Sequence, residues 1–113
     1  MINEILKASG VTFAQGRFLR RPDGTHAVYF DDTEVDAADP TGRTSEGGLP
    51  RVVTHNVTVE VYEPAPDNAT EAAIEAELDA RGISWSKQDR YWLKDLQRYQ
   101  VIYEFTYHTK RRI

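Results

Sequence analysis

Residues 51–62 form the longest alternating pattern in the chain, and this pattern constrains the fold more than any other feature. Most of the alternate positions are valine, and the residues between these positions are mainly polar. Because successive side chains of a strand point to opposite faces, the pattern predicts a long strand with one dry and one wetter face. Pro64, just after Glu63, should end the strand, since proline has no N–H to donate. The predicted dry face consists of Val53, His55, Val57, Val59 and Val61.

Shorter signals precede this strand. Residues 2–7 have apolar side chains at helical spacing, and Gly10 should stop that helix. Residues 11–14 and 26–30 read as short strands, separated by a Pro-Asp-Gly turn at 22–24. The N-terminal third of the chain therefore predicts one short helix and two strands.

The segment after Pro64 predicts a second, longer helix. Asn68 is the expected N-cap, with Glu71 three residues later in a variant of the capping box. Gly82 should end the helix in a left-handed conformation, with Ile83 touching Leu78. A change of Gly82 to valine should therefore strain the backbone.

Strand signals return after this helix. Residues 83–87 alternate as a strand, whereas 88–96 fit either the end of that strand or a helical turn. Residues 99–108 alternate again, with apolar side chains on both faces, which favours a central position in the sheet. The aromatic residues concentrated in this part of the chain are expected mostly in the core, with a subunit interface as the alternative.

These elements predict a single α+β domain over residues 1–113, in the order α-β-β-β-α-β-β. The sheet is expected to be mainly antiparallel, with four to five strands and both helices packed against it. If the strands at 51–62 and 83–87 pair, the helix between them forms a right-handed parallel crossover. Residues 36–49 lack any apolar period and predict a long exposed loop, and residues 109–113 predict a mobile basic tail.

Composition excludes several classes of function. The formal net charge is -4, from 14 basic and 18 acidic residues, which argues against a general binder of nucleic acid or of acidic membranes. The chain has no cysteine, so disulfides and thiolate metal sites are excluded. No apolar run is long enough for a transmembrane helix, and we expect a soluble protein made in a cytoplasm, without a membrane partner.

Residues with catalytic or metal-binding chemistry form no recognisable motif. His26, His55 and His108 are not at metal-ligand spacing; we expect a satisfied nitrogen on His55 and solvated rings for the other two. An EF-hand counted from Asp31 fails at its glycine and glutamate positions. No serine lies in a nucleophile elbow, and no glycine-rich segment fits a phosphate loop. We therefore expect no enzyme activity, no metal and no cofactor.

The order and spacing of five segments resemble a known family. These segments are 10–18, 27–30, 57–64, 74–87 and 99–105. Together they resemble the small tail terminator proteins of long-tailed bacteriophages, also called tail completion or tail-to-head joining proteins. The resemblance covers most of the chain outside residues 36–49, and its motifs are structural rather than catalytic.

This resemblance implies a structural protein of the virion, located at the head–tail junction. Such a protein caps the tail tube as a hexameric ring, ends its polymerisation and joins the tail to the head connector. The implied partners are further copies of the chain, the tail tube protein and the head completion or connector protein. DNA passes through the lumen without specific binding, and neither a cofactor nor an enzyme activity is implied.

The acidic segment and the long loop are the expected ring or lumen contacts. Carboxylates around a lumen would repel DNA phosphates and keep the passage open. The edge strand at 11–14 is a further candidate for the contact between subunits. The competing function is a small-molecule-binding or regulatory α+β module with a pocket between helix and sheet. The candidate contact residues are Asp31, Asp32, Glu34, Asp36, Asp39, Arg43 and Glu46.

Overall fold

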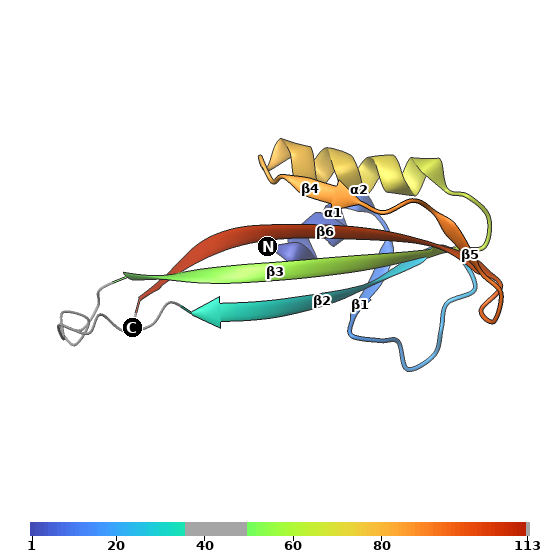
Figure 1. The fold of residues 1–113 in the computed structure, drawn as a ribbon, viewed down its shortest axis with the longest axis horizontal. Coiled ribbons are helices and arrows are strands. Elements are labelled where there is room, and N and C mark those ends of the chain that lie inside the picture. The colour runs from blue at the N-terminus through green and yellow to red at the C-terminus, as the bar shows by residue number, and fades with distance from the viewer. Residues whose placement is uncertain (36–49, 113) are drawn as a thin grey trace.

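The computed structural model describes residues 1–35 and 50–112; for residues 50, 51 and 110–112 it describes the backbone only. Two helices and six strands make an α+β fold (Figure 1). The elements are α1 (Ile2–Ser9), β1 (Thr12–Gln15), β2 (His26–Val35), β3 (Pro50–Glu63), α2 (Asn68–Ala80), β4 (Trp85–Lys87), β5 (Tyr91–Leu93) and β6 (Arg98–Arg112).

The six strands form one mixed sheet in the order β1-β2-β3-β6-β4, with β5 also paired to β6. The predicted α+β class and the mainly antiparallel sheet are confirmed, and β6 is central as expected. Two pairings differ from the prediction. β1 and β2 are parallel, and β3 does not pair with β4, because β6 lies between them and is antiparallel to both. The ambiguous segment 88–96 contains β5, which is why the strand count exceeds five.

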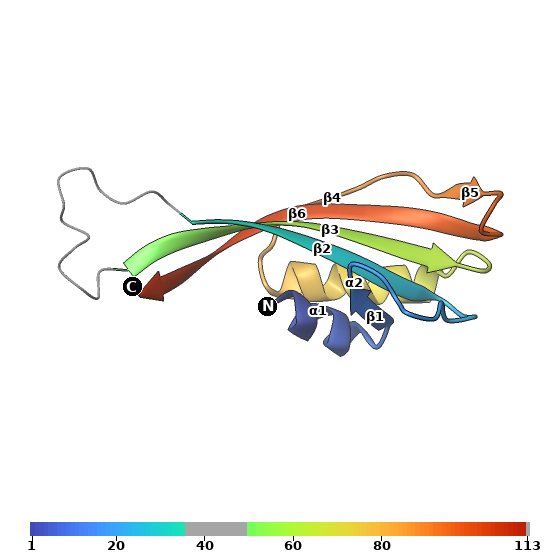
Figure 2. The ribbon, with the colours of Figure 1, turned by 90° about the horizontal axis from the view of Figure 1, so that it is seen from below.

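Both helices lie on the same face of the sheet (Figure 2). Their apolar stripes pack on the predicted dry face of β3 and on the matching face of β6. Burial removes these side chains from water and supplies the main stabilising free energy of the fold. The core includes Ile5, Leu6, Val59, Val61, Ile74, Leu78, Val101 and Tyr103, each at most 1% exposed.

The helices cover only one half of the long strands (Figures 1 and 2). Beyond them, three strands continue as a projection that we call the arm. The arm consists of residues 32–35 of β2, 50–56 of β3 and 106–112 of β6, in continuous antiparallel register.

Two segments that were expected to be irregular are strands in the arm. β2 was expected to stop at residue 30 but continues to Val35, because each residue of 31–35 pairs with β3. This pairing overrides the weak strand propensity of aspartate and glutamate. Residues 109–112, expected as a mobile tail, are the last part of β6 and pair with β3 as far as Pro50. Ile113 and the predicted loop at 36–49 lie outside the described residues.

The C-terminal end of α2 is as predicted from the sequence, whereas the N-cap lies one residue before the predicted position. Gly82 has φ of 68°, and the Ile83 N–H donates to the Leu78 carbonyl at 3.0 Å, as predicted. The N-cap is Asp67 rather than Asn68, because the Asp67 carboxylate accepts from the Thr70 N–H at 3.0 Å.

Candidate functional site

The acidic residues of β2 fall into two environments at the base of the arm. Asp32 and Glu34 are exposed, whereas the side chain of Asp31 is only 16% exposed. The other predicted contact residues, Asp36, Asp39, Arg43 and Glu46, lie outside the described residues. The structure therefore places three of the seven predicted residues on one strand, at one end of the sheet, and separates Asp31 from the other two by burial.

A hydrogen-bonded network around His55 accounts for the burial of Asp31. The His55 Nδ1–H donates to Asp31 Oδ2 at 3.0 Å, and Nε2 lies 3.0 Å from Thr109 Oγ1. The imidazole stacks on the Tyr107 ring at a centroid distance of 4.5 Å. These contacts join β2, β3 and β6 where the arm leaves the helix-covered half, so they hold the arm in line with the rest of the sheet. The expectation that His55 has satisfied nitrogens is confirmed.

The sheet face opposite the helices carries several exposed apolar side chains at or near the arm. Phe30 is 45% exposed and Val52 is 37% exposed. Around them, cross-strand pairs are polar, with Thr106 Oγ1 donating to Asn56 Oδ1 at 2.9 Å. Such a face, polar with a few apolar side chains, resembles the average composition of non-obligate protein interfaces.

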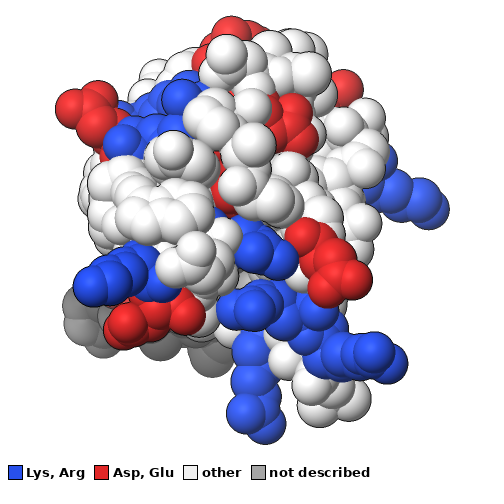
Figure 3. Space-filling view, turned by 90° about the vertical axis from the view of Figure 1, so that its right-hand side faces the viewer, with Lys and Arg blue, Asp and Glu red and all other residues white. Residues whose placement is uncertain are grey.

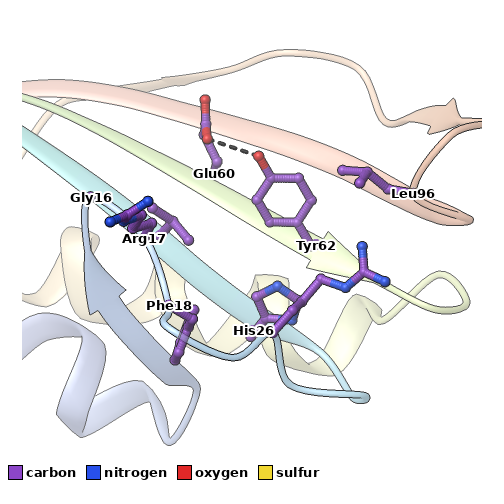
Figure 4. A pocket seen from close by; sticks show the side chains of 9 residues that line it. Gly16, Arg17, Phe18, His26, Glu60, Tyr62 and Leu96 are labelled. Atoms are coloured by element: carbon purple, nitrogen blue, oxygen red, sulfur yellow. Dashed lines mark hydrogen bonds between the residues drawn. The ribbon is translucent and has the colours of Figure 1, made fainter.

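A cavity of about 240 Å³ lies at the other end of the same face, between the loop at 16–25 and the sheet (Figure 4). Arg17, Arg21 and His26 stand at its wall, and Tyr62 forms its floor with Glu60 beside it. His26 was expected to be solvated, but it is 2% exposed, because its ring packs between the Phe18 and Tyr62 rings.

The floor of this cavity is a fixed polar arrangement. The Tyr62 hydroxyl donates to Glu60 Oε1 at 2.9 Å and accepts from Gln100 Nε2 at 3.1 Å. Burial, followed by the hydrogen bond to Glu60, raises the pKa of Tyr62 to about 12. Tyr62 therefore stays protonated at neutral pH and cannot act as a base there.

Lysine and arginine side chains gather at the end of the molecule that contains this cavity (Figure 3). Arg17, Arg20 and Arg21 on the loop and Lys94 on the β5–β6 turn are exposed. Arg98 fastens the loop to β6, because its Nη2 donates to the Asp23 carbonyl at 3.0 Å. These cations attract carboxylate-rich surfaces, although exposed acidic side chains such as Asp23 and Asp95 lie among them (Figure 3).

Two carboxylates are buried on the helix-covered face, where α2 begins. Glu63 on β3 is 0% exposed and Glu71 on α2 is 3% exposed. The Arg90 guanidinium lies over both: its Nε donates to Glu63 Oε1 at 3.2 Å and its Nη2 to Glu71 Oε2 at 2.5 Å. Lys87 extends the cluster, with Nζ 2.8 Å from Glu71 Oε1 and 2.8 Å from Glu75 Oε2.

The two buried carboxyls titrate differently. Burial, followed by the hydrogen bond with Glu71, raises the pKa of Glu63 to about 7. Burial also disfavours the ionised form of Glu71, but its hydrogen bonds with Glu63, Arg90 and Lys87 outweigh burial and lower its pKa. Each charged group of the cluster has an oppositely charged partner. The cluster therefore braces α2 and the segment before β5 against the sheet.

This cluster was not predicted from the sequence, although one signal was present. Glu63 has the same parity as Val59 and Val61, so it lies on the buried face, where an acidic side chain requires a partner. Among the described residues, no three His, Cys, Asp or Glu side chains are grouped as metal ligands. No helix in the described part of the chain is long and apolar enough to cross a membrane.

Compared with protein-family models and with curated proteins, the sequence matches none significantly.

Proposed function

We propose that this chain is a tail terminator of a long-tailed bacteriophage, a structural subunit that assembles into a hexameric ring at the end of the tail tube. In this role it stops tube polymerisation and joins the tail to the head completion or connector protein. Its partners are further copies of itself, the tube protein and the connector, and it works in the virion without catalysis or a cofactor.

The observation that carries the proposal is the arm. A ring needs heterologous contacts, in which one patch of a subunit meets a different patch of its neighbour. The arm extends past the helices and is bounded by β2 on one side and β6 on the other. Two different strand edges on one projection supply the two unlike patches that a ring requires.

The distribution of charge supports the same role. Asp32 and Glu34 are exposed on the arm, and carboxylates around a lumen would repel the phosphates of passing DNA. The opposite end of the molecule carries a group of exposed cations that includes Arg17 and Arg21. A subunit with two differently charged ends can face the tube with one end and the connector with the other.

The test is electron microscopy of particles from a strain in which this gene is deleted. The proposal expects filled heads beside separate tails that are over-long or ragged. A plasmid copy of the gene should restore joined particles with tails of normal length. Joined particles of normal length in the deletion strain would overturn the proposal.

A small-molecule-binding or regulatory module is the second candidate, and the cavity beside Tyr62 is the observation that favours it. This cavity lies on the helix-free face, whereas the pocket was expected between helix and sheet. Binding to the folded state would raise the melting temperature. A screen of anionic metabolites that produces no thermal shift, together with the deletion phenotype described above, would remove this candidate.

A further inference from the structure

Both edges of the arm are open. β1 pairs with β2 only as far as Tyr29, and β4 pairs with β6 only at residues 103–105. Among the described residues, therefore, 30–35 of β2 and 106–112 of β6 have a strand neighbour on one side only. An open edge presents unpaired N–H and C=O groups that can bind another strand.

The two open edges carry opposite charge. The β2 edge contains the exposed Asp32 and Glu34, whereas the β6 edge ends in Lys110, Arg111 and Arg112. Charged edges prevent unwanted sheet addition, because two like edges repel each other. Here a β2 edge repels another β2 edge and a β6 edge repels another β6 edge. Only the pairing of β2 with the β6 of a second copy brings opposite charges together.

Strand direction is compatible with this pairing. β2 is antiparallel to β3, and β3 is antiparallel to β6, so β2 and β6 run in the same direction. Subunits placed side by side around a ring axis would therefore join β2 to the neighbouring β6 as a parallel pair. Closing strands into a barrel requires a stagger between neighbours. A stagger of a few residues places Glu34 beside the basic end of β6.

Exposed apolar side chains on β2 also favour a second copy as the partner. Phe30 is 45% exposed and Val35 is 38% exposed, and they lie at the two ends of the open edge. A neighbouring strand would cover part of both side chains. The edge therefore combines unpaired backbone groups, apolar side chains and a charge pattern that selects an unlike edge.

We propose that the β2 edge of one copy pairs with the β6 edge of the next, so that the arms join into one continuous barrel around the lumen. The partner is a second copy of this chain. This inference rests on the ring of the proposed function, and it specifies the contact that closes that ring.

Disulfide cross-linking tests the contact directly, because the chain has no cysteine. Three single variants are made: Glu34→Cys on β2, and His108→Cys and Lys110→Cys on β6. Neighbouring strands bring Cα atoms within the range that a disulfide spans. Oxidation is carried out on the free protein at high concentration and on tails purified from the deletion strain.

We expect a cross-linked dimer when Glu34→Cys is mixed with one of the two β6 variants, and none when a variant is oxidised alone. A double variant with both cysteines should give a ladder that ends at the hexamer. The matched control is Thr12→Cys on the β1 edge, which should not link to either β6 variant. If the mixtures do not link on tails or in solution, or if single variants link equally well, the proposal is overturned.

Charge reversal gives an independent readout and separates the two proposals. In the double variant with Glu34→Cys and His108→Cys, Asp32→Lys should abolish the ladder, as should Lys110→Glu with Arg111→Glu, and combining the three charge changes should restore it. If the protein still caps tails but cross-links fail, the strand contact is wrong and the terminator function stands. If the ladder forms but the deletion strain has normal tails, the contact stands and the terminator function is wrong.

Discussion

Glu63 and Glu71 lie together under one guanidinium, and both accept hydrogen bonds from Arg90, at 3.2 and 2.5 Å. The first carboxyl has its pKa raised to about 7, and the second has its pKa lowered. Near neutral pH, the site therefore changes from sharing one proton to holding two negative charges beside Arg90 and Lys87. This change makes the stability of the fold depend on pH.

The first prediction concerns Glu63→Gln. The folded protein holds the Glu63 proton more tightly than the unfolded chain, whose pKa is 4.5. The stability that this group contributes is therefore fully present below about pH 4.5 and is lost as the pH rises through 7. We expect the wild-type free energy of unfolding to fall by about 3 kcal/mol across this range on account of Glu63.

Glutamine imitates the protonated carboxyl and should remove this dependence. Urea unfolding of both proteins between about pH 4.5 and pH 8 measures the effect. The variant should be the more stable protein at the alkaline end and differ least at the acidic end. A variant that is less stable at every pH would contradict the assignment of the shared proton to Glu63.

The second prediction concerns Arg90→Met. Removing the guanidinium leaves Glu63 and Glu71 buried without their shared cation, and we expect a loss of about 3 kcal/mol or more at alkaline pH. The loss should shrink on acidification, because protonated carboxyls need no cation. Arg81→Met is the matched control: Arg81 pairs with Glu77, whose side chain is 30% exposed rather than buried, so its loss should cost less than about 1 kcal/mol. Equal losses in the two variants would refute the role of Arg90.

The elements that could be predicted from sequence are those with local periodicity. The alternation identified β3, its buried face and β6, and Gly82 marked the end of α2, because strand parity and positive φ are properties of a few neighbouring residues. Strand order is not local. Nothing near residues 83–87 indicates that β6 separates β4 from β3, or that β1 joins β2 in parallel.

The parts of the candidate site that were missed depend on tertiary contacts. Asp31 reads as a solvated loop residue until β2 pairs with β3 and brings His55 beside it. Arg90 reads as a single surface charge until α2 folds back and places Glu71 next to Glu63. In both cases a residue's role is set by a partner more than 15 positions away in the chain, at separations of 24 and 19.

The third prediction concerns Gly82→Ala, which tests backbone strain without a steric clash. Gly82 has φ of 68°, and a Cβ there would meet nothing within 4 Å. We expect a loss of about 1 kcal/mol from the left-handed conformation alone. Gly24→Ala is the control, because its Cβ also meets nothing and its φ is not positive. Comparable losses at the two positions would show that φ is not the cause.

The fourth prediction separates the cap of α2 from its neighbour. The Asp67 carboxylate accepts from the Thr70 N–H at 3.0 Å and from the Thr25 hydroxyl at 2.8 Å. Asp67→Ala should therefore destabilise the protein by about 1–2 kcal/mol. Asn68→Ala should cost less, because Asn68 Oδ1 accepts a hydrogen bond from Arg90 Nη2 at 2.7 Å and not from an N–H of the first turn of α2. Thermal unfolding measures both losses. A larger loss for Asn68→Ala than for Asp67→Ala would show that Asn68 is the N-cap.

The fifth prediction concerns the loss of stability when each acidic residue of β2 is replaced by lysine. Asp31 accepts from His55 at 3.0 Å, and its side chain is 16% exposed, so Asp31→Lys should destabilise by about 1–3 kcal/mol. Asp32 and Glu34 are exposed, and the same change at either should alter stability by less than about 0.5 kcal/mol. Urea unfolding measures all three.

The stability of each variant decides how a loss of infectious particles is interpreted. A loss of infectious particles with Asp32→Lys or Glu34→Lys, at unchanged stability, assigns those carboxylates to the ring contact or to the lumen, because the subunit is still folded. The same loss with Asp31→Lys follows from damage to the arm itself. Infectivity that is unchanged by the Asp32 and Glu34 variants would remove the exposed carboxylates of β2 from both roles and leave the backbone edge and the exposed apolar side chains as the assembly features of that strand.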